Sequence, residues 1–469
     1  MLVRAFLCLA IAVLAGPATA QVAPAPATNW FRVLTEYGTQ IGHRSQQVTQ
    51  SAEGRETVSL QELLLQEPGD PVSRAASQTV VTEDSTGRVI AISDYSQTGR
   101  SWTRTTAKIE PGRAIITRAT KSDTHTTTIP LPPGTRFDAG AGLLRNWDGK
   151  TILEFRNFSL DAQAVERMTI EPAPGGAIRK RYDGDQLRGA ARLELGTDGR
   201  VTAMIQPMFG SRIAIVPATR EEALAGHPPF RMFATVMIKS PVRIAEPAAQ
   251  GHIRYRFGFR DGIVFTPPET GEQRVTMAGG EATVDICDSC GPGLPTDPAF
   301  LADARRATPW LQIDHPRIRA ITGRTARLKI GDARKMELLT AEAIGHLGKI
   351  DFTGHYSALE TLERGAGDCT EAAVLLAAFG RAVGIPTKVV NGLVYSRERY
   401  HGVSNAFMPH SWVLAFVGGK WRSYDAALST FDSTHIALSI GDGDARSLTA
   451  AGQLGSLLTW QSMAEVRTR

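Results

Sequence analysis

The stretch from Trp30 to Cys287 constrains the fold most, because it consists of short runs rich in β-branched residues and lacks any long segment with helical periodicity. Runs such as Arg88–Ser93 and Arg113–Arg118 alternate with turn signals, among them Pro111-Gly112. The residues flanking Asp198-Gly199 predict a hairpin. We therefore expect antiparallel sheets over residues 30–220 and a smaller β module over residues 228–290.

A different pattern begins at residue 291. A segment rich in Gly and Pro leads to Asp297-Pro298, which is typical of a helix start with an acceptor at the N-cap and Pro in the first turn. Helical spacing of apolar residues follows at about 336–347. With 469 residues, the chain is too long for one small core. The predicted fold class is α+β, with N-terminal antiparallel β-sheet followed by an α+β domain over residues 291–469.

The first 20 residues are predicted to be a secretory signal peptide. Arg4 precedes an apolar run over residues 6–15, and Ala18-Thr19-Ala20 forms a cleavage site. Residues 21–29 follow as a flexible spacer. The alternative is an uncut N-terminal anchor, but the apolar run is too short for a stable membrane span. We expect a secreted, periplasmic protein. Its net charge of +5 is spread along the chain, so no nucleic-acid partner is predicted.

Cleavage would leave three cysteines, of which Cys287 and Cys290 stand in a Cys-Asp-Ser-Cys motif. In an oxidising compartment these two are expected to form a disulfide, leaving Cys369 as a free thiol. A metal site or a redox pair is the alternative reading. Zinc needs about four ligands, and the sequence offers no second motif of this kind. No metal and no cofactor are therefore predicted.

Cys369 follows a glycine-rich loop and is predicted to be the first residue of a helix. Asp368 and Glu371 have the spacing of a capping box, and Gly384-Ile385-Pro386 ends the helical pattern. Backbone N–H groups and the helix dipole at this end favour a thiolate. The two acidic caps oppose that effect, so a cationic partner is needed.

That partner is predicted in the segment Pro409–Asp425. Gly418-Gly419 is the signal of a two-residue turn between apolar strands, and this turn places Trp412 opposite Asp425. His410 shares the face of Trp412, so His410 and Asp425 become diagonal neighbours about 7–8 Å apart at the backbone. A shift of one residue would separate them onto opposite faces.

These residues form a candidate Cys–His–Asp triad. Cys369 would be the nucleophile, His410 the base and later the acid, and Asp425 the group that orients the imidazole. The backbone N–H of Cys369 supplies one donor to an oxyanion. Tyr356 is a candidate for the second donor, along with Trp310 and Gln312.

The sequence gives weaker signals for the residues around the triad. Trp412 is expected to be a wall of the site that shields the pair from water. His355, His401 and His435 lie near the motifs, and we expect them to be surface residues or satisfied polar residues. A buried structural thiol remains the alternative for Cys369.

Together, in order, the motifs resemble the transglutaminase-like superfamily, whose members share a papain-like core. They are Gly367–Glu371, Gly384-Ile385-Pro386, Pro409–Trp412, and Gly419–Trp421 followed by Asp425. The resemblance covers residues 310–444. It implies acyl transfer through a thioester, with Cys369, His410 and Asp425 at the family's catalytic positions.

The predicted function is an exported thiol-dependent enzyme that acts on amide bonds of a peptide or protein. Water as acceptor makes it a cysteine protease or amidase, and an amine makes it a protein-glutamine acyltransferase. The alternative is a non-catalytic periplasmic binding or scaffolding protein that retains the core. The partners of the β-rich half are not indicated by the sequence.

Overall fold

The computed structural model describes residues 28–66, 71–98, 101–121, 124–208, 211–231, 237–350, 355–398 and 403–466. The expected signal peptide and most of the expected spacer lie outside these residues. The first strand begins at Thr28, where Thr28 and Asn29 pair with Gln47 and Gln46. The spacer prediction over residues 21–29 was therefore wrong at its end, because ladder bonds to the next strand extend the sheet by two residues.

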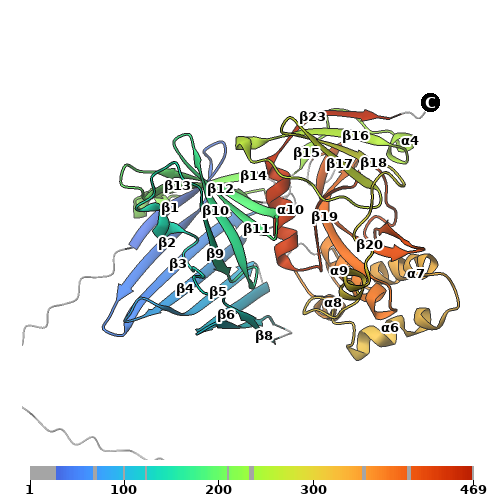
Figure 1. Cartoon of the computed structure of the whole chain (residues 1–469), viewed down its shortest axis with the longest axis horizontal. Helices are drawn as coiled ribbons and strands as arrows, with labels where there is room; N and C mark the ends of the chain where they lie inside the picture. Colours follow the sequence, from blue (N-terminus) through green and yellow to red (C-terminus); the bar gives the residue numbers. More distant parts are fainter. Residues whose placement is uncertain are drawn as a thin grey trace, which may run out of the picture.

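The N-terminal half is one antiparallel sheet of 14 strands (Figure 1). Sequential strands pair within β1–β8 and within β9–β14, and β1 pairs with β14, which joins the two meanders and leaves β8 and β9 as the two ends of the sheet. Thr-rich β8 alternates exposed and half-buried residues, as expected of a strand with one covered face. The strands are β1 (Thr28–Thr35), β2 (Gln40–Gln50), β3 (Gly54–Leu65), β4 (Ser73–Asp84), β5 (Val89–Thr98), β6 (Ser101–Glu110), β7 (Arg113–Ala119), β8 (Thr124–Pro130), β9 (Leu153–Ser159), β10 (Ala164–Ala173), β11 (Gly176–Asp183), β12 (Gln186–Leu195), β13 (Val201–Met208) and β14 (Ser211–Ala218).

The two ends of this sheet approach each other. The segment after β8 bonds to β9, since Arg136 N–H donates to the Arg156 carbonyl and Phe158 N–H donates to the Arg136 carbonyl, both at 2.8 Å. Phe158 packs in one buried cluster with Ile116 of β7. Short helices α1 (Ala141–Leu144) and α2 (Arg220–Ala223) lie in the connections. The sheet is thus curved around an interior.

The C-terminal half contains a five-stranded antiparallel sheet with helices packed against it. Its path runs β15-β20-β19-β22, with β21 paired to β20. The N-cap prediction at Asp297 is confirmed, because its carboxylate accepts the Phe300 N–H at 3.0 Å. The elements are β15 (Ile238–Lys239), α5 (Pro298–Asp303), α6 (Pro316–Arg327), α7 (Asp332–Gly345), α8 (Ala358–Arg364), α9 (Cys369–Ala382), β19 (Thr387–Ser396), β20 (Ala406–Val417), β21 (Lys420–Tyr424), β22 (Ile436–Gly441) and α10 (Ala445–Leu457).

A third sheet has the order β17-β18-β16-β23. Three of its strands come from the predicted β module, and the fourth is the C-terminal strand, whose Glu465 pairs with Ile253. The module and the C-terminal region therefore share a sheet, which the sequence did not indicate. The elements are α4 (Glu246–Ala249), β16 (Ile253–Phe259), the 3-10 turn Arg260–Gly262, β17 (Gln273–Ala278), β18 (Glu281–Ile286) and β23 (Leu458–Glu465). Cys287 and Cys290 form a disulfide directly after β18.

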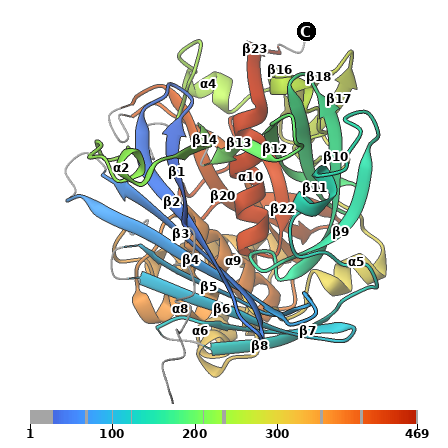
Figure 2. The same cartoon turned by 90° about the vertical axis from the view of Figure 1, so that its left-hand side faces the viewer.

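Helix α10 lies between the two halves of the molecule (Figures 1 and 2). It contacts β12 and β13 of the large sheet and β19 and β22 of the C-terminal sheet. Leu454 and Leu457 of α10 share a buried cluster with Ile178 of β11 and with β16. The overall class is α+β, as predicted, with the helices gathered in the C-terminal half. Within the described part of the chain, no helix is long and apolar enough to cross a membrane.

Candidate active site

Cys369 is the first residue of α9, and the predicted capping box holds it there. The Asp368 carboxylate accepts the Thr370 N–H at 2.7 Å, and the Glu371 carboxylate accepts the Asp368 N–H at 3.0 Å. Every residue from Thr370 to Arg381 is buried, and the helix packs against β19 and β20. Its apolar body therefore anchors the helix, while its capped tip presents the partly exposed Cys369.

The hairpin register is the one that the glycine pair predicts. Val417 pairs with Lys420, and the ladder runs to Val413 opposite Tyr424, directly before Asp425. His410 and Asp425 meet in a buried hydrogen bond of 2.7 Å between Nε2 and Oδ2. Their side chains are 1% and 0% exposed, so solvent does not compete for this bond.

The tip of α9 approaches β20 at Ser411. Among the described residues, the ladder with β21 stops at Val413 and β15 pairs with Ala406 and Phe407, so the described parts of these strands do not reach His410 and Ser411. The backbone N–H of Ser411 approaches the Cys369 sulfur closely enough to favour its thiolate form. The thiol thus lies beside the residue that follows His410.

Burial and nearby carboxylates dominate the electrostatics at the Cys369 thiol, in the direction that the acidic caps predict. Burial raises the pKa of Cys369 well above its usual value, and the negative charges of Asp368, Asp425 and Glu371 raise it further. The N–H of Ser411 acts in the opposite direction but does not outweigh them. The helix terminus therefore does not offset burial and these carboxylates, which favour the protonated thiol.

His410 has one ring nitrogen left for such a proton. Its Nε2 bonds to Asp425, whereas Nδ1 is buried without a hydrogen-bond partner among the described residues. Trp412 lies nearly parallel to the imidazole, with ring centroids 6.2 Å apart, and is 1% exposed. Trp412 is thus buried beside His410, and its role as a wall of the site stays a prediction.

The structure adds His435 to this cluster. Its Nε2 lies 3.1 Å from the same Asp425 oxygen that His410 contacts, and its Nδ1 lies 3.1 Å from an Asp432 oxygen. Burial favours the neutral ring, but the two carboxylates outweigh it and raise the pKa of His435 to about 9. Likewise, burial favours protonated Asp425, yet His410 and His435 hold the pKa of Asp425 well below its usual value. His435 is therefore an imidazolium between two carboxylates at neutral pH.

Sequence reasoning placed His435 among satisfied polar residues and missed its contact with Asp425. The only local signal was Asp432 three residues earlier, before an apolar strand. His355 is hydrogen-bonded at one ring nitrogen, since its Nε2 lies 2.8 Å from the Gly443 carbonyl oxygen, whereas its buried Nδ1 has no hydrogen-bond partner among the described residues. His401 lies outside the described residues.

Two groups of side chains have the composition of metal ligands. The polar atoms of His410, Asp425 and His435 lie within 4.8 Å of one another, but hydrogen bonds already join them. His252 lies beside Cys287 and Cys290, whose disulfide removes both thiolates as ligands. Hydrogen bonding and the disulfide account for both groups.

The candidate oxyanion residues have different surroundings. The backbone N–H of Tyr356 donates to Glu371 at 3.1 Å, and Arg364 covers its ring at 3.9 Å. The Gln312 amide donates to the Pro309 carbonyl and accepts the Leu359 N–H, so it already has backbone partners. These contacts place Tyr356 next to α9 and give the Gln312 amide two backbone partners, and both oxyanion assignments stay predictions.

Trp310 packs against the buried cluster that contains α9. Its ring stacks on the His355 imidazole, with centroids 4.5 Å apart. The Arg118 guanidinium of β7 also lies over the Trp310 ring, 4.8 Å from its centroid. Trp310 therefore takes part in the boundary between the two halves of the molecule.

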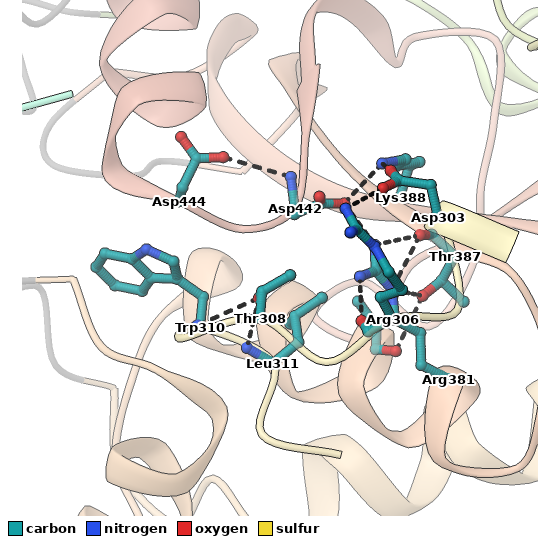
Figure 3. Close-up of polar contacts among 11 residues, drawn as sticks. Asp303, Arg306, Thr308, Trp310, Leu311, Arg381, Thr387, Lys388, Asp442 and Asp444 are labelled. Atoms are coloured by element: carbon teal, nitrogen blue, oxygen red, sulfur yellow. Dashed lines mark hydrogen bonds and ion pairs between the residues drawn. The ribbon is translucent and has the colours of Figure 1, made fainter. Parts of the chain in front are cut away.

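A network of ions fixes the far end of α9 (Figure 3). The buried Arg381 guanidinium donates to Asp442 and to the Thr387 carbonyl, and Lys388 bridges Asp442 and Asp303 at 2.9 and 3.1 Å. The Asp442 N–H in turn donates to Asp444, the N-cap of α10, at 3.4 Å. The network connects α9, β19 and α10, so it sets the position of the helix that carries Cys369.

Comparison with known families agrees with this geometry. Residues 320–426 match the model of the transglutaminase-like superfamily, and the matched range contains Cys369, His410 and Asp425. The C-terminal region is thus transglutaminase-like. No curated protein matches the chain significantly.

Solved structures give weaker likenesses. A candidate cysteine protease from Cytophaga hutchinsonii is 15% identical over 47% of this chain and 88% of that one, with a TM-score of 0.30. A β-barrel-like protein of a domain of unknown function from Brucella abortus is 16% identical over 41% and 96%, with a TM-score of 0.32. TM-scores this low do not define a shared fold.

Proposed function

We propose that this protein is an exported thiol enzyme that transfers acyl groups from amide bonds of a peptide or protein, with Cys369, His410 and Asp425 as its catalytic residues. The proposal rests on the buried hydrogen bond from His410 Nε2 to Asp425, which leaves His410 Nδ1 without a partner among the described residues, and on the next residue, Ser411, whose N–H approaches the Cys369 sulfur. A nucleophile, a base and an orienting carboxylate in this order are the parts of a triad.

The raised pKa of Cys369 determines how the first step proceeds. His410 Nδ1 takes the thiol proton while the sulfur bonds to the substrate carbonyl carbon, and the carbonyl oxygen becomes an oxyanion. The N–H of Cys369 at the positive end of α9 is one donor to that oxyanion. Asp425 stabilises the imidazolium that forms.

Collapse of the tetrahedral intermediate completes the transfer. The C–N bond breaks, His410 returns its proton to the leaving amine, and a thioester on Cys369 remains. Water or a primary amine then gives up a proton to His410 and attacks the thioester, and the sulfur leaves as the regenerated thiol. Water gives hydrolysis, and an amine gives a crosslink.

Alkylation tests the activated thiol, since Cys369 is the one free cysteine in the described chain. We expect iodoacetamide to modify the wild type at pH 8 at least 10-fold faster than the His410→Gln variant. The matched control is His252→Gln, because His252 also bonds a carboxylate, Asp285, at 2.8 Å, but outside this site. Equal rates in the wild type and His410→Gln would refute a base at His410.

Turnover distinguishes the enzyme from the binding alternative. We expect a quenched casein substrate to be cleaved, or dansylcadaverine to be incorporated into it, by the wild type and not by Cys369→Ala. If Cys369→Ala instead restores every phenotype of a deletion strain, the protein acts by binding. Fractionation of cells that express the full chain tests export, with the mature protein expected in the periplasm.

A further inference from the structure

A cavity of about 830 Å³ lies between the large N-terminal sheet and the C-terminal half. Side chains of β5 to β13 line one side, and α10 with the segment 308–310 lines the other. Figure 3 shows Thr308, Trp310, Asp442 and Asp444, four of the lining residues from the C-terminal half. Neither Cys369 nor His410 belongs to the lining, so this space is distinct from the candidate active site. Its volume is in the range of small-ligand sites.

One side of the cavity carries a guanidinium without a counter-charge. Arg179 on β11 contacts only the Ala139 carbonyl and the Met204 sulfur, each at 3.5 Å, and no carboxylate of the described chain forms an ion pair with it. Burial and the neighbouring Arg181 lower the pKa of Arg179 to about 10. A cation in such surroundings costs free energy unless an anion joins it.

Another strand contributes the opposite charge. Asp94 on β5 lines the cavity, and one of its oxygens accepts the Thr79 hydroxyl at 2.7 Å. Within the described residues no Lys, Arg or His pairs with it, and Asp161, also in the lining, is its charged neighbour. Burial and Asp161 raise the pKa of Asp94. The carboxylate thus lacks a cation, as Arg179 lacks an anion.

The other charged groups of the lining are mostly compensated. Glu166 lies between Arg181 at 3.9 Å and Arg446 at 3.6 Å, and Arg188 bonds Asp183 at 3.0 Å. The uncompensated charges are therefore Arg179 at one place, and Asp94 with Asp161 at another. An acyl chain would satisfy neither, whereas a ligand with an ammonium and a carboxylate would satisfy both.

We propose that this cavity is a second binding site, which takes a short peptide with free ends, its carboxylate at Arg179 and its ammonium at Asp94. Arg179 presents a planar fork that suits a carboxylate, and Asp94 has an oxygen free to accept from an ammonium group. The site lies on the large sheet, so it gives the N-terminal half a ligand of its own, independently of chemistry at Cys369.

Calorimetry with matched peptides tests this site. The protein is the full mature chain with Cys369→Ala, so that the probe is not consumed. The probes are tri-alanine, its N-acetyl form and its C-terminal amide. We expect tri-alanine to bind at least 10-fold more tightly than either blocked form.

Two variants test which residue binds the carboxylate of the peptide and which binds its ammonium group. In Arg179→Gln, tri-alanine and its amide should bind equally, whereas the acetyl form should still be weaker. In Asp94→Asn, tri-alanine and its acetyl form should bind equally. Arg192→Gln on the neighbouring strand, outside the lining, should leave all three affinities unchanged, and circular dichroism melts check that each variant folds. No binding of tri-alanine, or equal affinity for its three forms in the parent, would overturn the proposal.

Discussion

His435 makes a pH-dependent contribution to stability that can be worked from the structure. Its pKa is about 9 in the folded protein, against about 6.5 for an unperturbed histidine. The difference of about 2.5 pKa units corresponds to about 3 kcal/mol of unfolding free energy. The ring is 1% exposed, so solvent does not screen its bonds to Asp425 and Asp432.

The sign follows from the proton count. Between pH 6.5 and pH 9 the folded state holds a proton on His435 that the unfolded state has lost, so stability falls as pH rises. The full contribution is present below pH 6.5 and is gone above pH 9. A His435→Gln variant lacks this titration. The difference in unfolding free energy between the wild type and His435→Gln should therefore shrink by about 3 kcal/mol between pH 6.5 and pH 9.

Urea unfolding at intervals from pH 6 to pH 10 measures this difference, provided that both proteins unfold reversibly. An Asp432→Asn variant adds a check, because loss of one carboxylate should lower the pKa of His435 and narrow the window. Unfolding free energies of wild type and His435→Gln that stay parallel across the range would refute an imidazolium at this position.

Three further expectations concern α9 and its surroundings. Arg381→Met leaves Asp442 facing Lys388 alone and removes donors to Thr387, so the unfolding free energy should fall by about 3–5 kcal/mol, measured by urea titration. Gly443→Ala places a Cβ 2.8 Å from a Val374 methyl group at φ +76°, and calorimetric melts should show a lower Tm, corresponding to a loss of about 1–3 kcal/mol. Because the pKa of Cys369 is raised, alkylation of His410→Gln should keep accelerating above pH 9, and a plateau below pH 8 would contradict this.

Local signals accounted for what the sequence predicted well. The capping box of Asp368 and Glu371 and the turn at Gly418-Gly419 depend on residues within a few positions, and the structure has both. Because the side-chain period of a strand is two, the turn also fixed which face His410 shares. The hydrogen bond between His410 and Asp425 follows from that short chain of inference.

Contacts between distant segments could not be predicted in the same way. The bond from His435 to Asp425 depends on β22 pairing with β19, and the fourth strand of the β16 sheet comes from the last described residues of the chain. Arg179 and Asp94 face one cavity only because the 14-stranded sheet curves. No periodicity in the sequence indicates that the sheet curves, because the curvature depends on how the whole sheet packs.

Charge balance links His435 to the proposed chemistry. Asp425 is a buried carboxylate, and one of its oxygens contacts both His410 and His435. The His435 imidazolium bonds this oxygen and offsets the negative charge of Asp425 before His410 takes the Cys369 proton in the proposed first step. When His410 then gains the proton, Asp432 supplies the second negative charge for two imidazolium rings. Two carboxylates for two histidines let one proton move within a buried site without leaving an uncompensated charge.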